Sequence, residues 1–122
     1  MGTDFAVPDA GLEEMMAAYD AVDLPQVCFG HIGDNHLHLN LLPRSASELQ
    51  AARAAYTDLA HRAVALGGTV SAEHGIGKLK RGLLADMVGP ATLASFRALK
   101  DAVDPAGILG RGTLLSPRGA AG

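Results

Sequence analysis

Two hydrophobic patterns alternate along the first part of the chain. Thr3–Val7, Val27–Ile32 and Leu37–Leu42 are short apolar or alternating runs that end at proline or at a polar turn, which is typical of strands. After Asp9, a residue that can cap a helix, apolar residues recur at helical spacing: Leu12, Met15, Met16, Tyr19 and Val22. We therefore expect a strand, a helix and then two further strands.

The next segment predicts a second helix and a fourth strand. Ser45–Glu48 has the pattern of a capping box, and the apolar positions after it share one helical face: Leu49, Ala52, Tyr56, Leu59, Ala60 and Ala63. Gly67 and Gly68 end this helix, and Thr69–Ser71 is expected to form the strand. The order βαββαβ predicts an α+β fold, a ferredoxin-like antiparallel sheet with both helices on one face. A C-terminal helix is expected from about Ala91 to Val103.

Length and composition indicate one ordinary domain over residues 1–122. Apolar residues make up 48% of the chain and charged residues 19%, which is typical of globular proteins. The net charge of −3, the absence of tryptophan and a single short basic cluster argue against a nucleic-acid partner. There is no apolar run of the ~20 residues that a membrane span needs, and we see no signal peptide, so a cytoplasmic location is expected. Cys28 excludes an internal disulfide, and its apolar neighbours predict a buried thiol.

Three of the five histidines lie within eight residues of the predicted hairpin: His31, His36 and His38. If Asp34 and Asn35 are the central pair of a two-residue turn, His31 lies directly opposite His38. Opposed side chains have Cβ atoms about 5 Å apart, so the two imidazoles could share a metal ion. A hydrogen-bonded histidine pair without a metal is the alternative interpretation of the hairpin alone.

A second segment, Ser71–Lys78, supplies the remaining candidates. Glu73 ends the predicted fourth strand and could be the third ligand, because two histidines and a carboxylate leave a coordination position open for a substrate. His74 follows it, and in an extended segment the two side chains would diverge, leaving His74 free to act as a base. Without the hairpin, a surface carboxylate and a capping histidine would explain this pair equally well.

Both segments, taken with a third, resemble a known family. Gly30–Asn40 is similar to the family segment G-H-x-G-D-G-N-x-H-x-N, and Ser71–Gly77 is similar to S-x-E-H-G-x-G. Asp104–Gly112 partly matches D-P-x-G-I-L-N-P-G, and the similarity runs in the same order from about Thr3 to Leu115. The chain thus resembles the C-terminal domain of the FAD-linked oxidases, which include D-lactate dehydrogenases, the flavin-binding component of glycolate oxidase and D-2-hydroxyglutarate dehydrogenases.

The resemblance implies a catalytic role for the histidine segments. It implies that His31, His38 and Glu73 hold a divalent metal, zinc or manganese, and that Asn40 helps hold the substrate. It implies that His74 takes the hydroxyl proton while the C2 hydride of a small D-2-hydroxy acid or glycolate passes to the flavin. That chemistry is sensible, because a metal on the hydroxyl lowers its pKa.

The chain departs from the family pattern at the turn. Asn35 stands where the family usually has glycine, and His36 where it usually has asparagine. We expect His36 to replace the hydrogen bonds of that asparagine rather than to bind the metal. In the third segment, Gly110-Arg111 replaces Asn-Pro, which removes any support for a flavin contact there.

Family members are several times longer, and a separate domain binds most of their FAD. We therefore expect this chain to be a piece of the cap that carries the metal and substrate residues. Its FAD would be bound mainly by an absent domain or subunit, with contacts from this chain unknown, and the isolated chain would be inactive. The alternative function is a non-catalytic ferredoxin-like module that binds a metal or ligand, or that assembles, for example as a homodimer.

Overall fold

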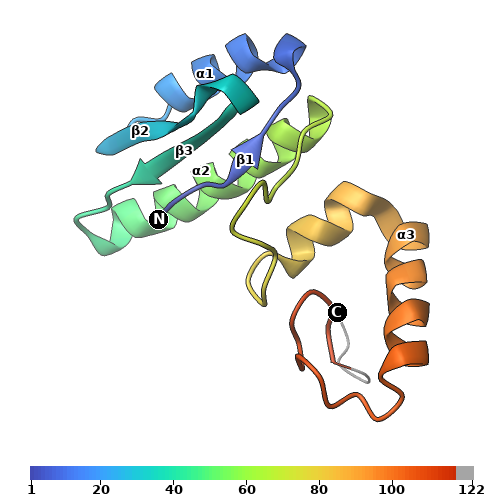
Figure 1. The fold of residues 1–122 in the computed structure, drawn as a ribbon. Coiled ribbons are helices and arrows are strands. Elements are labelled where there is room, and N and C mark those ends of the chain that lie inside the picture. The colour runs from blue at the N-terminus through green and yellow to red at the C-terminus, as the bar shows by residue number, and fades with distance from the viewer. Residues whose placement is uncertain (118–122) are drawn as a thin grey trace. The chain divides into compact units, whose positions relative to one another are not determined.

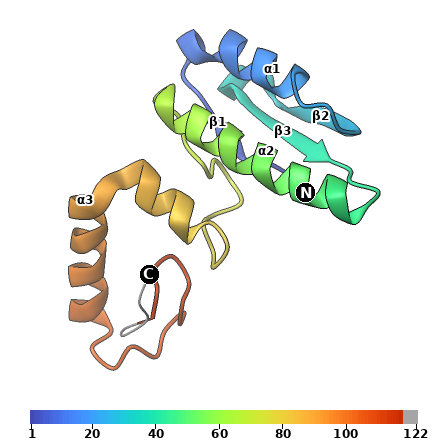
Figure 2. The same ribbon diagram turned by 180° about the vertical axis from the view of Figure 1, so that it is seen from behind.

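Residues 1–117 are described by a computed structural model (Figures 1 and 2). The chain divides into two compact units, Met1–His74 and Gly75–Gly122, of which the second includes residues 118–122 that lie outside the described part. The single domain expected over residues 1–122 stays a prediction. No helix within the described residues is long and apolar enough to cross a membrane.

The first unit has an α+β architecture, as predicted. Its elements are β1 (Phe5–Ala6), the 3-10 turn η1 (Asp9–Gly11), α1 (Leu12–Asp20), β2 (Gln26–His31), the 3-10 turn η2 (Ile32–Asp34), β3 (His36–Leu41) and α2 (Ala46–Ala65). The strands form an antiparallel sheet in the order β1-β3-β2. Figures 1 and 2 show α1 and α2 on the same face of this sheet.

The expected fourth strand does not form, which corrects the prediction. Thr69 makes a single antiparallel bridge to Ala6, and the chain then bends through residues 70–74. The reason is local competition for hydrogen bonds. The Ser71 backbone N–H donates to the Thr69 hydroxyl at 3.2 Å, and the N–H groups of Glu73 and His74 donate to the side chain of the residue before β1. The described residues therefore form a three-stranded sheet, and the ferredoxin-like βαββαβ topology is not shown.

The central strand β3 separates the core from the opposite face of the sheet. Its sequence alternates, so side chains two positions apart share a face. Leu37, Leu39 and Leu41 are buried. Small residues on α2 are fully buried and let the helix pack closely: Ala52, Ala60 and Ala63. The other face of β3 carries His36, His38 and Asn40.

Tyr19 on α1 ties the core to β3. Its ring is buried, and its hydroxyl donates to the Leu37 carbonyl oxygen at 3.0 Å. Burial raises the pKa of Tyr19 to about 12. The phenol is therefore a neutral donor inside the core.

The hairpin register differs from the predicted one by two residues. The connection is not a two-residue turn: Ile32–Asp34 form a 3-10 turn, and Asn35 follows in the left-handed region at φ 49°. The Asn35 N–H donates to the Ile32 carbonyl at 3.2 Å, which closes this longer turn. The observed pairs are His31 with His36, Phe29 with His38 and Val27 with Asn40. An even shift keeps all of these side chains on one face, so the predicted face was right and the predicted partners were wrong.

Cys28 is exposed, so the expectation of a buried thiol was wrong. Its strand, β2, lies at the edge of the sheet and pairs only with β3 among the described strands. An edge strand has a neighbour on one side only, so apolar sequence neighbours do not ensure burial.

The second unit is built around α3 (Arg81–Val103). Helical geometry breaks at Gly89, with φ 75° and ψ 167°, just before Pro90. Proline disfavours helical geometry in the residue before it, and glycine adopts the positive φ that joins the two halves. The second half is the predicted helix from Ala91 to Val103, which is confirmed; the first half was missed.

Asp104 closes α3 and shapes the loop after it. Its carboxylate accepts hydrogen bonds from the backbone N–H groups of Ile108 and Leu109 at 3.1 and 3.0 Å. The Lys100 ammonium donates to it at 2.5 Å. This hydrogen bond from Lys100, together with the two from the backbone, lowers the pKa of Asp104 to about 2.

Candidate metal and substrate site

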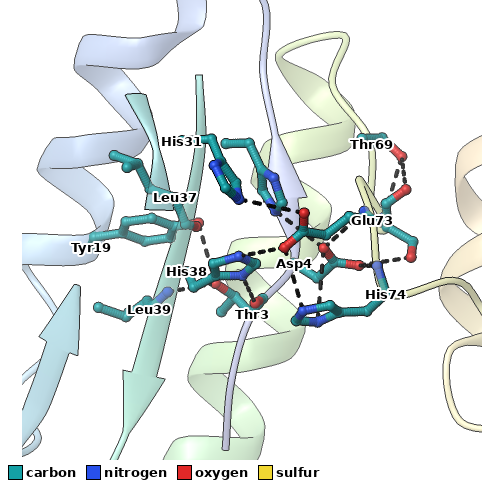
Figure 3. A network of polar contacts seen from close by, with 12 residues as sticks. Thr3, Asp4, Tyr19, His31, Leu37, His38, Leu39, Thr69, Glu73 and His74 are labelled. Carbon is teal, nitrogen blue, oxygen red and sulfur yellow. Dashed lines mark hydrogen bonds and ion pairs between the residues drawn. The ribbon is translucent and has the colours of Figure 1, made fainter. Parts of the chain in front are cut away.

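The five predicted site residues come together on the sheet face opposite the helices. A hollow of about 530 Å³ is lined by Phe29, Gly30, His31, His38, Asn40, Glu73 and His74. Figure 3 shows the rings of His31, His38 and His74 gathered around the carboxylate of Glu73. These residues come from β2, from β3 and from the bend after Thr69, all within the first unit.

The three predicted ligands have the spacing of atoms that share one ion. Glu73 Oε1 lies 3.0 Å from His38 Nε2, and Glu73 Oε2 lies 3.4 Å from His31 Nε2. Two ligand atoms that are each ~2.1 Å from a zinc ion lie roughly 3.4 Å apart in a tetrahedral arrangement and closer in an octahedral one. The ligand set is therefore compact enough for a divalent ion without rearrangement of the backbone.

His38 has an acceptor at each ring nitrogen. Its Nδ1 lies 3.0 Å from the Thr3 carbonyl oxygen, and its Nε2 lies 3.0 Å from the Glu73 carboxylate. A carbonyl and a carboxylate only accept hydrogen bonds, whereas a neutral imidazole carries one N–H. With Nδ1–H donated to Thr3, the Nε2 lone pair faces Glu73, and a cation is needed between them. A backbone carbonyl on the far nitrogen is also the usual way in which a metal-binding histidine is oriented.

Asp4 is a site residue that the sequence analysis missed. It is fully buried, and its carboxylate accepts from four donors. Oδ1 accepts from His36 Nε2 at 3.1 Å and from the Glu73 N–H at 3.1 Å. Oδ2 accepts from the Ser71 hydroxyl at 2.8 Å and from the His74 N–H at 3.0 Å. The available signal was an acidic residue inside a predicted strand, because aspartate is rarely buried without a partner or a function.

His36 is held by this carboxylate. Its ring is almost fully buried and donates from Nε2 to Asp4. This is a hydrogen-bonding role of the kind expected from its position in the motif. His36 still lies close to the ligand set, since one ring nitrogen is within 4.8 Å of ligand atoms of His31, His38 and Glu73.

His74 does not diverge from Glu73, and that part of the prediction was wrong. The chain bends at residues 72–74, so the segment is not extended. The His74 ring stacks on His38 with centroids 4.9 Å apart and an interplanar angle of 8°. Its Nε2 is 3.6 Å from Glu73 Oε1, and its side chain is 58% exposed. A base at this position can reach a group bound beside Glu73.

Asn40 and Phe29 complete the lining of the hollow beside His38. Asn40 is two residues beyond His38 on β3 and bridges to Gly2. A Cβ atom on Gly2 would lie 2.4 Å from Asn40 Oδ1, so the backbone passes close to this amide. Phe29 is 55% exposed, and its ring centroid is 5.3 Å from that of His38. The hollow thus combines polar groups with one apolar wall.

Residues 3–114 match the family model of FAD linked oxidases, C-terminal domain. The chain belongs to this family. It is 33% identical over 119 residues to the probable mitochondrial D-lactate dehydrogenase of Danio rerio, covering 93% of this chain and 24% of that protein. It is 30% identical over 119 residues to glycolate oxidase subunit GlcD of Bacillus subtilis, with 93% and 25% covered. The D-2-hydroxyglutarate dehydrogenase of Xanthomonas citri is 36% identical over 115 residues, with 89% and 24% covered.

This FAD-linked oxidase domain thus spans about a quarter of the length of the curated relatives it matches. All five predicted site residues, and Asp4, lie in its unit Met1–His74. The match to the family confirms the resemblance found in the sequence. The metal, the substrate and the roles of the individual side chains remain to be proposed.

Proposed function

We propose that this chain is the metal- and substrate-binding part of an FAD-dependent 2-hydroxy acid dehydrogenase. Family membership and the named relatives support the reaction class, since those relatives include a D-lactate dehydrogenase, a glycolate oxidase component and a D-2-hydroxyglutarate dehydrogenase. The observation that carries the proposal is His38, whose two ring nitrogens both face acceptors. The substrate we propose is a small D-2-hydroxy acid or glycolate.

The proposed metal ligands are His31 Nε2, His38 Nε2 and the Glu73 carboxylate. Zinc and manganese both accept imidazole and carboxylate ligands. Such an ion, when bound, lowers the pKa of a substrate hydroxyl on it and so eases removal of the proton. Three protein ligands leave coordination positions open for the substrate, which agrees with the exposed hollow beside them.

The remaining residues would bind the substrate and move its proton. His74 Nε2 lies beside Glu73 and lines the hollow, so it can accept the hydroxyl proton of a substrate bound there. The Asn40 amide can donate to the substrate carboxylate, and Phe29 can exclude water from one side. A flavin, held mainly by a domain or subunit outside this chain, supplies the electron sink for the C2 hydride.

Metal binding by the purified chain tests this function directly. We expect about one Co²⁺ or Zn²⁺ per chain, with affinity at least tenfold lower in His31→Ala and in Glu73→Gln. Both side chains are about half exposed, so these variants should keep the fold. His61→Ala is the matched control, because it removes an exposed histidine on α2. Equal affinities for all four proteins, or no binding by any of them, would refute the proposal.

The same titration separates the alternative function. A metal-free chain with an unchanged fold would favour a non-catalytic module that binds another ligand or assembles. Exposed Val27, Phe29 and Ile32 along the edge strand and its turn favour assembly, for example as a homodimer, which size-exclusion chromatography with light scattering would detect. The isolated chain is expected to show no oxidation of D-lactate or glycolate with an artificial electron acceptor.

A further inference from the structure

We propose that Asp4 is the positioning residue of this site: it places Glu73 and His74 and holds His36 out of the metal coordination shell. The inference rests on the proposed function, because it assigns how the metal site is built. It extends that function by giving one buried carboxylate control over both the ligand geometry and the open coordination position.

The first support is that one residue organises the whole bend. The Asp4 carbonyl accepts from the Ala72 N–H at 3.0 Å, and its carboxylate accepts from the next two backbone N–H groups, those of Glu73 and His74. Three successive N–H groups pointing at one acidic residue form an anion-binding concavity. The bend lies outside any strand, and its backbone N–H groups at residues 72–74 all donate to Asp4. The direction of the Glu73 and His74 side chains therefore depends on Asp4.

The second support is that the carboxylate has no acceptor position to spare. A carboxylate offers about four lone-pair positions, and Asp4 uses four, two on each oxygen. An asparagine of the same shape would present an NH₂ group to two of these donors. The serine hydroxyl can rotate to accept, but the backbone N–H groups and the histidine N–H cannot. The arrangement is thus specific for an ionised aspartate.

The third support is the orientation of His36. Its ring lies 4.4 Å from that of His38 and 5.6 Å from that of His31, centroid to centroid. Because Nε2 donates its proton to Asp4, that nitrogen has no lone pair for a metal. Released from Asp4, the ring could supply a fourth protein ligand. Four protein ligands are typical of closed structural sites, whereas three leave room for a substrate. Asp4 would therefore help to keep the site open.

The test uses Co²⁺, whose visible spectrum reports the number and type of its ligands, with glycolate as the probe of the open position. In Asp4→Asn we expect at least tenfold weaker Co²⁺ affinity or a shifted visible band, and loss of the spectral change on adding glycolate. Asp58→Asn, at an exposed aspartate on α2, is the matched control and should behave as wild type. Wild-type affinity, band and glycolate response in Asp4→Asn would overturn the proposal.

His36→Asn keeps the inference testable even if Asp4→Asn does not fold. Because His36 is held outside the coordination shell, this variant should keep the Co²⁺ affinity within about threefold and leave the visible band unchanged. A tenfold loss or a shifted band would show that His36 is a ligand and overturn the inference. In the double variant Asp4→Asn/His36→Asn, any band that arises from His36 ligation should disappear.

A metal-free measurement distinguishes failure of this inference from failure of the proposed function. Amide hydrogen exchange of wild type should show protected N–H groups at Glu73 and His74, and Asp4→Asn should exchange them at least tenfold faster. If the chain binds no Co²⁺ but shows this protection, the proposed metal function fails and Asp4 still positions the bend. If the two amides are unprotected in wild type, the positioning role is refuted whatever the metal result.

Discussion

Gly30 offers a sharp test of how the hairpin is built, because a second glycine nearby serves as its control. Gly30 lies on β2 directly before His31 and has φ +145°, a conformation that favours glycine. A Cβ atom there would lie 2.5 Å from the His36 carbonyl oxygen and 3.0 Å from the Leu37 Cα. Gly33, in the turn, has nothing within 4 Å of its added Cβ and no positive φ.

The expected cost of Gly30→Ala follows from these two effects. A residue held in a sparsely populated backbone region costs about 1–3 kcal/mol. Forcing a methyl group against fixed backbone atoms costs about 1–3 kcal/mol more. We therefore expect the free energy of unfolding to fall by about 2–6 kcal/mol, whereas Gly33→Ala should change it by no more than about 0.5 kcal/mol. For a unit of this size, each kcal/mol corresponds to roughly 4–8 °C in Tm, so Gly30→Ala should melt at least about 10 °C lower.

Thermal unfolding followed by circular dichroism at 222 nm measures this difference for wild type and both variants. A Gly30→Ala protein that melts within about 2–3 °C of Gly33→Ala would refute the reasoning, because the backbone would then have room for the methyl group. The substitution also moves His31 relative to His36 across the hairpin. Co²⁺ affinity should therefore fall in Gly30→Ala and stay unchanged in Gly33→Ala.

Two further predictions concern pH. The pKa of Tyr19, raised by burial to about 12, means that the folded chain keeps the phenol proton that the unfolded chain loses near pH 10. The stabilising contribution is complete below pH 10 and is lost as the pH rises toward 12, by up to about 2–3 kcal/mol, so Tyr19→Phe should flatten the alkaline decline in urea unfolding; equal slopes for both proteins would count against this. Asp104, whose pKa is lowered to about 2 chiefly by Lys100, stabilises the second unit above its ordinary pKa near 4, and this stabilisation is lost as the pH falls toward 2. Asp104→Asn should lack this acid-dependent loss, as followed by the amide resonances of Ile108 and Leu109; an unchanged acid profile in the variant would contradict the assignment.

The elements of the first unit were predictable where a hydrophobic period was clear. The alternation on β3 and the helical repeats on α1 and α2 determined which side chains face the core. The capping box was also partly right: the Ser45 hydroxyl accepts from the Glu48 N–H at 3.1 Å. Glu48, however, accepts from the Arg44 N–H, one residue before the position expected of a capping box. Local pattern thus predicted the element and the face, and less of the detail at its ends.

The errors arose where a contact distant in sequence or a short turn decided the geometry. The hairpin register depended on the Asn35–Ile32 hydrogen bond, and turn length is weakly encoded when several turn types suit the same residues. The fourth strand and the direction of His74 depended on Asp4, which lies 69 residues before Glu73. No periodicity within a window of roughly 10–20 residues contains such a pair. The first half of α3 was missed because glycines on either side of it suggest a loop.

The family was recognised from the motifs alone, because long motifs in a fixed order carry information that secondary-structure patterns lack. The identity of the metal, the 2-hydroxy acid and the cytoplasmic location stay predictions. His31, His38, Asn40, Glu73 and His74 were chosen from the sequence and lie around one hollow. Asp4 needed the structure, because its importance comes from what it holds rather than from a ligand pattern.

The alternation of β3 has a consequence for how this segment tolerates mutation. In a saturation library read separately for protein abundance and for metal binding, Leu37, Leu39 and Leu41 should reject polar residues in the abundance readout. Asn40 should tolerate many residues for abundance and few for ligand capture. His38 should score low in both, since it is buried and also faces Glu73. A strand of six residues would then show two interleaved fitness profiles, one for each face of the sheet.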